Sequence, residues 1–197
     1  MHYRQQKALL TRKKILDAAL ELFTEKGFDE VKVSDIVKKS KTSKGAFYTH
    51  FSSKYEIFLE KFKEIDDFYI TYEQDQTGPQ TPLQFIENLH KAQVHYLKDE
   101  LGKDTVRTIY MNVLRADQDS FVADKKRPYF HIVKKFIKKG QEDGSIREDM
   151  SSEVLTAQIT KAIRGNIYDW CSNDKYDLEK EQDYLLSILL LGLTPKQ

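Results

Sequence analysis

One stretch near the N-terminus decides the fold: Ser34-Asp-Ile-Val-Lys-Lys-Ser-Lys-Thr-Ser-Lys-Gly-Ala-Phe-Tyr-Thr-His-Phe51. Its first half has the composition of a short helix, which breaks at residues 40–42. Ser43, a favoured N-cap residue, then opens a second short helix on which Phe47 and Phe51 share one face. Two short helices joined by a short turn predict a helix-turn-helix, in which the second helix enters the major groove of DNA.

The second helix of this stretch begins with a cation and two small residues. Lys44 is followed by Gly45 and Ala46, so the backbone can approach DNA closely while the helix dipole favours phosphate. The competing interpretation is a pair of surface helices that join two larger ones. The side chains expected to reach phosphates follow in the sequence and are Tyr48, Thr49, His50 and Lys54.

Charge is distributed unevenly along the chain. Residues 1–55 carry 12 Lys and Arg against 6 Asp and Glu, a net of +6, whereas the remaining 20 basic and 25 acidic residues give −5. Clustered cations bind phosphate backbones by counterion release, so the N-terminal part is a candidate for polyanion binding. A randomly uneven surface is the alternative.

The composition describes a folded chain of one or two domains with 197 residues. A charged fraction of 32% and a mean hydropathy of −0.63 exclude an integral membrane protein. A hydrophobic fraction of 40% excludes a disordered chain. The single cysteine, Cys171, can form neither an internal disulfide nor a paired-cysteine zinc site, so we expect a cytoplasmic protein.

Apolar residues recur at helical spacing along the chain, and no alternating strand pattern interrupts them. We therefore expect an all-α fold of about nine helices, with one domain over residues 1–53 and a second over 54–197. Thr81 before Pro82, and Ser151 or Ser152, are expected N-caps. The expected helices cover about residues 11–26, 34–39, 43–50, 54–72, 82–101, 106–114, 125–137, 151–170 and 178–193.

The segment Ser43-Lys-Gly-Ala-Phe-Tyr-Thr-His-Phe-Ser-Ser-Lys54 resembles the recognition-helix signature of the TetR family of transcriptional regulators. The helix that ends in Lys26-Gly27-Phe28 resembles that family's first helix, so the likeness covers about residues 11–60. A weaker likeness covers residues 140–170.

The resemblance implies a three-helix DNA-binding domain, a fourth helix that links it to a helical ligand-binding and dimerisation domain, and a homodimer. Such a homodimer binds a near-palindromic operator in double-stranded DNA and represses transcription until a small molecule releases it. The family's DNA-facing positions correspond to Thr42, Ser43, Lys44, Gly45 and Ala46 for the groove, and to Tyr48, His50 and Lys54 for phosphates.

Three residues depart from the family's usual pattern. Lys41 stands where a glycine commonly makes the turn, Thr42 where valine is common, and Lys32 where a threonine often caps the second helix. A lysine in a left-handed turn costs about 1–2 kcal/mol. Both lysines add positive charge where DNA would lie, so Lys41 joins the expected DNA-binding residues.

The final helix, residues 178–193, is apolar on nearly every side, which predicts that a second subunit covers it. The family resemblance implies that the last two helices pair with those of a partner, whereas an internal core helix is the alternative. The expected interface residues are Leu155, Ile159, Ile163, Ile167, Leu185, Ile188 and Leu189.

The middle helices supply apolar and aromatic side chains that suit a lipophilic or aromatic small-molecule effector. Each of them also suits an ordinary core, and a buried Tyr or Trp usually bonds to backbone. The candidate ligand-binding residues are Phe62, Tyr69, Phe85, Leu89, Tyr96, Tyr110, Met111, Phe130 and Trp170.

No phosphate loop, activated nucleophile or metal set is readable, so we expect neither an enzyme nor a cofactor. His90 and His95 are five residues apart and do not share a helical face, which argues against a metal site. One alternative is a helical small-molecule-binding protein or enzyme with a vestigial DNA-binding head. The lysines at 38, 39, 41 and 44 argue against it, because they would have no evident use. Another alternative is a protein that compacts nucleic acid without a preferred sequence.

Overall fold

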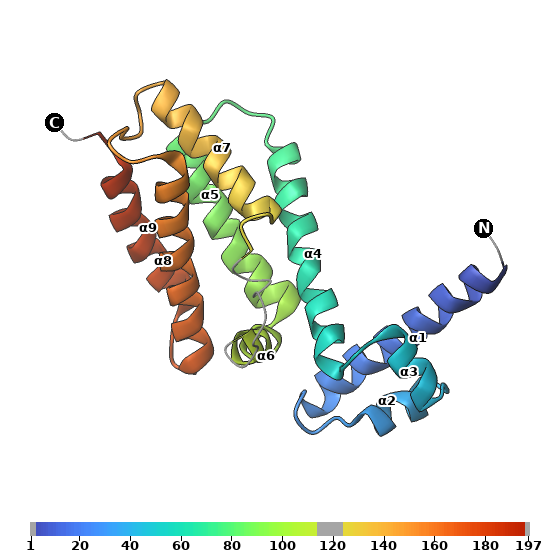
Figure 1. Ribbon diagram of the computed structural model, residues 1–197. Helices are drawn as coiled ribbons and strands as arrows, with labels where there is room; N and C mark the ends of the chain where they lie inside the picture. The colour runs from blue at the N-terminus through green and yellow to red at the C-terminus, as the bar shows by residue number, and fades with distance from the viewer. Residues whose placement is uncertain (1–2, 114–123, 196–197) are drawn as a thin grey trace. The chain divides into compact units, whose positions relative to one another are not determined.

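The computed structural model describes residues 3–113 and 124–195, and all regular structure in these ranges is helical. The predicted all-α class is confirmed, with nine α-helices and one π-helix in the described ranges (Figure 1). The chain divides into two compact units, Met1–Lys63 and Glu64–Gln197. The division falls inside helix α4 (Lys54–Asp75), which contributes to both units, whereas the expected domain boundary lies at the start of this helix.

The first unit contains α1 (Tyr3–Lys26), α2 (Val33–Lys39), α3 (Lys44–His50) and the beginning of α4. Helix α1 ends where the sequence predicts, because Gly27 adopts a φ of +79° that favours glycine. The amide of Gly27 donates to the Phe23 carbonyl at 2.9 Å. The helices enclose an apolar core made of Ile15, Ala19, Phe23, Ile36, Phe47, Phe51, Ile57 and Phe58.

Three phenylalanine rings join the end of α1 to the beginning of α4. The ring centroids of Phe23, Phe28 and Phe58 lie 5.2, 4.7 and 4.8 Å apart in pairs. Such tilted and edge-to-face pairs stabilise by about 0.5–1.5 kcal/mol beyond the area they bury. Phe28, which follows the end of α1, thus packs back onto that helix.

The second unit is a set of helices in which α5 packs on α7 and α9, and α8 packs on α6, α7 and α9. Helices α8 and α9 lie side by side (Figure 1). Besides the end of α4, the elements of this unit are α5 (Pro82–His95), the π-helix η1 (Tyr96–Leu101), α6 (Lys103–Val113), α7 (Pro128–Glu142), α8 (Ser152–Ser172) and α9 (Leu178–Leu193).

Local sequence sets the starts of α5 and α8. Thr81 Oγ1 accepts from the Gln84 amide at 3.2 Å, and Gln84 Oε1 accepts from the Thr81 amide at 2.9 Å, which forms a capping box. Pro82 takes the first helical position, where its missing N–H costs nothing. Ser151 caps α8 with its side-chain oxygen, so both predicted N-caps are confirmed. The π-helix after α5 ends at Gly102, at a φ of +77°.

The turn after α7 requires glycine at one position. A Cβ at Gly140 would lie 2.5 Å from the buried side chain of Ile146, whose amide donates to the Gly140 carbonyl at 2.8 Å. The next amide, that of Arg147, donates to the Leu193 carbonyl at 2.8 Å. This turn therefore fastens the end of α7 to the end of α9.

Candidate nucleic-acid interface and effector site

The turn between α2 and α3 places a lysine in the left-handed region. Lys41 has a φ of +53°, the one positive φ outside glycine among the described residues. The Thr42 amide donates to the Val37 carbonyl at 3.0 Å and the Lys41 amide to the Lys38 carbonyl at 3.3 Å, which is the Schellman pattern. The chain thus makes the tight turn without glycine, at a strain of about 1–2 kcal/mol.

Neighbouring hydroxyls and a carboxylate support this turn. Thr42 is half-buried, and its Oγ1 lies 2.8 Å from Oγ of the buried Ser40. Asp35 Oδ2 accepts from the Lys32 amide at 2.9 Å, so an acid three residues on bonds the start of α2 although Lys32 has no capping oxygen. Thr42 therefore serves the turn as well as the surface at which we expected it.

The first turn of α3 is exposed on one side. Ser43 caps the helix, because its Oγ accepts from the Ala46 amide at 3.0 Å. Lys44, Gly45, Tyr48 and Thr49 are exposed. They stand at positions i, i+1, i+4 and i+5 and so share a face. The structure thus brings together most of the predicted DNA-binding residues, while Ala46 and His50 are half-buried beside them.

The opposite face of α3 belongs to the core. Phe47 and Phe51, which share one helical face, are buried with ring centroids 6.1 Å apart. The guanidinium of Arg12 on α1 lies 4.7 Å from the Phe51 ring centroid and pairs with Glu60 on α4. Helix α3 is therefore held from behind by α1 and the beginning of α4.

The hydrogen bonds of Lys54 do not fit its predicted contact with phosphate. Its Nζ donates to the carbonyls of Phe28 at 2.6 Å, Asp29 at 3.2 Å and Val31 at 2.9 Å, and lies 4.2 Å from the Phe28 ring centroid. An ammonium group has three N–H donors, and all three are used inside the unit. Lys54 therefore stabilises the loop between α1 and α2 and has no donor left for phosphate.

Lys39 also has a structural role. Its Nζ lies 2.8 Å from Glu21 Oε1 and 3.1 Å from Glu25 Oε1, which ties α2 to α1. The other three lysines that we counted as a basic cluster, Lys38, Lys41 and Lys44, are exposed. The cations available to DNA on this side of the unit are thus fewer than the sequence suggests.

The comparison with protein families agrees with this geometry. Residues 15–60, which include the turn, the cap and the exposed side of α3, match the family described as bacterial regulatory proteins, tetR family. The N-terminal part of the chain is therefore similar to the DNA-binding part of TetR-family regulators.

The similarity to individual TetR-family regulators extends over nearly the whole chain. The fatty acid metabolism regulator protein of Bacillus subtilis (strain 168) is 24% identical over 184 residues, which cover 92% of this chain and 95% of that protein. The FadR repressor of Thermus thermophilus in complex with lauroyl-CoA superposes with a TM-score of 0.78 at 22% identity, covering 94% and 96% of the two chains. FadR from Bacillus subtilis in complex with stearoyl-CoA gives 0.69 at 23% identity, covering 92% and 98%.

The predicted effector residues are distributed over both units. Phe62 belongs to the first unit and the other eight to the second. Met111 is exposed, so it does not line an interior site, and Tyr96 and Tyr110 are half-buried. The remaining candidates are buried and are Tyr69, Phe85, Leu89, Phe130 and Trp170.

A polar chain crosses the interior of the second unit where the aromatic candidates lie. His90 Nδ1 lies 2.6 Å from the Ile86 carbonyl oxygen, which only accepts, so this nitrogen carries the proton. The other ring nitrogen therefore accepts from the Tyr129 hydroxyl at 2.8 Å. Gln93 Nε2 donates to the Tyr69 hydroxyl at 2.7 Å, and the Tyr69 and Tyr129 rings lie 5.1 Å apart.

Tyr129 and Gln93 were not among the candidate site residues, and His90 was considered only as a metal ligand. Burial lowers the pKa of His90 to about 4, against a weaker opposing effect of its hydrogen bond to Ile86. His90 is therefore neutral at pH 7 and serves as a structural hydrogen-bonding group. Among the described residues, no group of three or more His, Cys, Asp and Glu could hold a metal ion.

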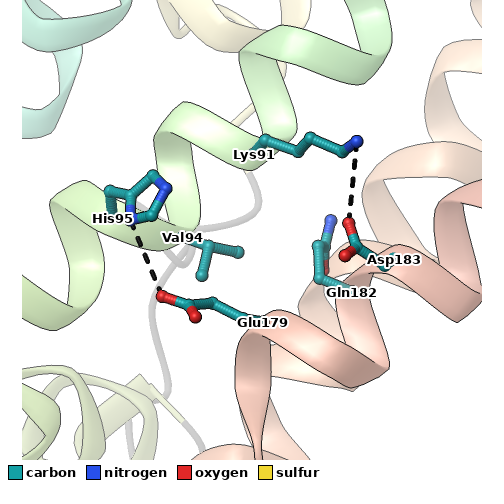
Figure 2. A pocket seen from close by; sticks show the side chains of 6 residues that line it. All are labelled: Lys91, Val94, His95, Glu179, Gln182 and Asp183. Carbon is teal, nitrogen blue, oxygen red and sulfur yellow. Dashed lines mark ion pairs between the residues drawn. The ribbon is translucent and has the colours of Figure 1, made fainter.

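A surface pocket of about 180 Å³ lies between α5 and α9 (Figure 2). Lys91 Nζ lies 3.8 Å from Asp183 Oδ1, and His95 Nδ1 lies 3.6 Å from Glu179 Oε1, so polar and charged side chains of its two walls face each other. Gln182 lies between them and accepts from Asn166 Nδ2 at 2.6 Å. Walls with such charged groups do not suit a lipophilic effector. The aromatic interior is the better candidate site for one.

The residues of α8 that we expected in the dimer interface are buried within the chain. The apolar residues expected there are part of the chain's own core and offer no surface to a partner, because α8 packs on α6, α7 and α9. The prediction is thus corrected for Leu155, Ile159, Ile163 and Ile167, which are 5, 2, 2 and 5% exposed.

Helix α9 does carry an exposed apolar row. Tyr184, Ile188 and Leu191 are 57, 68 and 74% exposed, and their spacing of i, i+4 and i+7 puts them on one face. Of the predicted interface residues, Ile188 lies in this row, and Leu185 and Leu189 are half-buried beside it. In the part of the chain that the structure describes, no helix is long and apolar enough to span a membrane.

The left-handed turn predicts the effect of glycine at position 41. Lys41→Gly removes the Cβ strain, so we expect the free energy of unfolding in urea to rise by about 1 kcal/mol. Lys41→Ala is the matched control, because it loses the same charge and keeps the Cβ. Equal stabilities for the two variants would show that the turn is not strained.

The buried imidazole predicts a pH dependence of stability. An unfolded chain binds a proton at His90 below about pH 6.5, whereas the folded chain stays neutral there until about pH 4. Acidification from pH 7 to pH 5 should therefore lower the free energy of unfolding by about 2 kcal/mol through this residue. Urea unfolding of His90→Gln at pH 7 and pH 5 should therefore show a loss of unfolding free energy that is about 2 kcal/mol smaller than that of the wild type. An equal loss in the two proteins would refute the role of His90.

Proposed function

We propose that the chain is a homodimeric, sequence-specific repressor of transcription that a lipophilic small molecule releases from its operator. The proposal rests on the exposed side of α3, which the Schellman turn at Lys41 and the cap at Ser43 present on a small helical unit. The family's function supports it, because the helix-turn-helix of a TetR-family regulator is its DNA-binding part.

Each exposed residue of this side has a separate role in the proposal. Ser43, Lys44 and Gly45, in the first turn of α3, meet the base edges of the major groove, since recognition helices read bases with their N-terminal residues. Tyr48 and Thr49, one turn later, meet the phosphates, and the exposed ammonium of Lys41 adds a phosphate contact. A protein with these contacts works in the cytoplasm, where operator DNA lies.

The proposal places the dimer contact at the exposed apolar row on α9. An apolar row that a single chain leaves in water loses that exposure when a second copy packs on it. Two recognition helices about 34–36 Å apart then read successive major-groove faces, so the operator is a near-palindrome.

The relatives favour a lipophilic effector with an acyl chain. Two FadR proteins that resemble the chain over more than nine-tenths of its length hold lauroyl-CoA and stearoyl-CoA. The buried aromatic residues of α5 and α7 provide apolar surface of the kind that such a chain requires. Release from DNA then requires that the effector binds the DNA-free state more tightly than the DNA-bound state.

A ligand-binding protein or enzyme with a vestigial DNA-binding head is the second candidate. It gives no reason for the exposed Lys38, Lys41 and Lys44 around a tight turn. The relatives reported above are regulators, which favours the repressor as well.

Selection from a random duplex pool at about 0.15 M salt tests the DNA-binding role. We expect a near-palindrome to be enriched, and Lys44→Ala to weaken binding about tenfold and relax the preference at one or two positions, as loss of a base contact does. Tyr48→Phe should weaken all sequences alike, and Lys138→Ala, on the second unit, should change nothing. Binding without any enriched sequence would contradict the repressor and favour compaction of nucleic acid.

Sedimentation tests the dimer. Ile188→Asp places a charge in the exposed row, so we expect dimer dissociation to become at least about 100-fold easier and the mass to fall to 23.1 kDa. Met150→Asp is the matched control, because Met150 is an exposed apolar residue outside α8 and α9. A dimer that withstands Ile188→Asp would place the interface elsewhere.

A further inference from the structure

One guanidinium of the second unit has a buried donor without an acceptor. Nε of Arg164, on α8, is buried and makes no hydrogen bond in the part of the chain that the structure describes. Arginine keeps its charge, and a buried donor without a partner is costly. The side chain as a whole is half-buried, so a molecule from solvent can reach it.

Two phenols stand near this guanidinium. Burial raises the pKa of Tyr110 and of Tyr129, and the positive charge of Arg164 acts on both in the opposite direction. Tyr110 belongs to α6 and Tyr129 to α7, and α8 packs on both helices. The charge of Arg164 therefore lies close enough to act on both phenols.

The phenols of this region have partners within the chain, whereas Nε of the guanidinium does not. Tyr129 bonds to His90 and to the side chain of Thr160, and Tyr69 accepts from Gln93. The buried Nε of Arg164 lacks an acceptor among the described residues, and an anionic acceptor forms the stronger bond with a guanidinium.

A second arginine near these phenols, Arg127, has a carboxylate partner and serves as a comparison. Arg127 donates from Nε and Nη2 to Asp66 Oδ1 at 3.0 and 2.8 Å, and both side chains are largely buried. Arg127 has its carboxylate within the chain, whereas no such carboxylate meets Nε of Arg164.

We propose that Arg164 binds the anionic group, a carboxylate or a phosphate, of a lipophilic effector, with the hydroxyls of Tyr110 and Tyr129 beside it. This inference rests on the proposed function and specifies the chemistry of its effector. The apolar part of the effector packs on buried side chains of α6, α7 and α8, the three helices that carry Tyr110, Tyr129 and Arg164. The pocket between α5 and α9 is a poorer site for the anion, because the carboxylates of Glu179 and Asp183 line it and the Lys91 ammonium already faces Asp183.

Calorimetric titration of the full-length protein with three probes of equal chain length tests the inference. Dodecanoate carries a carboxylate, dodecyl phosphate carries a phosphate, and dodecanol carries neither. We expect at least one anion to bind at least tenfold more tightly than dodecanol, and the preferred anion identifies the head group. Tighter binding of dodecanol, or no binding of any probe, would overturn the inference.

Three variants connect the preference to the residue. Arg164→Gln should lose at least tenfold in affinity for the preferred anion and leave dodecanol unchanged, whereas Arg164→Lys should lose less, because it keeps the charge without the planar fork. Lys138→Gln removes one exposed charge from α7 and should match the wild type. Equal anion affinity in Arg164→Gln and wild type would overturn the inference.

DNA binding separates this inference from the proposed function. Arg164→Gln should keep its thermal midpoint and its affinity for the selected operator, and dodecanoyl-CoA should release it at least tenfold less readily than the wild type. A wild type that binds and leaves operator DNA normally, with an equally responsive Arg164→Gln, refutes the role of Arg164 alone. A wild type that binds no preferred DNA refutes the repressor, while the titrations still decide the anion site.

Discussion

The ammonium group of Lys54 stabilises the loop between α1 and α2, on which the rest of the first unit depends. The loop between α1 and α2 has carbonyls outside any helix, and buried carbonyls need donors. Lys54 supplies donors to three of them, at Phe28, Asp29 and Val31. This loop determines where α2 begins, and the turn that ends α2 determines where α3 begins. The exposed side of α3 thus depends on a cation that belongs to α4.

Much of this unit could be predicted from sequence because its signals are local. The cap at Ser43, the terminating Gly27 and the buried pair Phe47 and Phe51 each act within one or two turns. The role of Lys54 could not be predicted in this way, because its acceptors lie 23 to 26 residues earlier in the chain. A lysine beside a recognition helix resembles a phosphate ligand until the loop that binds it is known.

In the second unit, too, contacts between residues distant in the sequence could not be predicted. Apolar periodicity predicted α8, and the family resemblance implied that its apolar residues meet a partner. Leu155, Ile159 and Ile163 are instead buried within their own chain, because periodicity gives the apolar face of a helix and not the element that covers it. The polar chain through His90 joins residues 39 positions apart and leaves no local pattern. Residues whose neighbours are adjacent in sequence were therefore predicted well, and residues whose neighbours come from distant helices were not.

The position of Trp170 gives the protein an optical reporter for one unit. Trp170 is the one tryptophan of the chain, and it is buried on α8 with the Lys103 ammonium 5.9 Å from its ring. Emission excited beyond the tyrosine absorption band therefore originates in the second unit alone. A ligand that fills that unit changes the emission directly, whereas operator DNA bound to the first unit changes it only if the two units are mechanically coupled. The native fluorescence of the chain thus distinguishes occupancy from communication without any label.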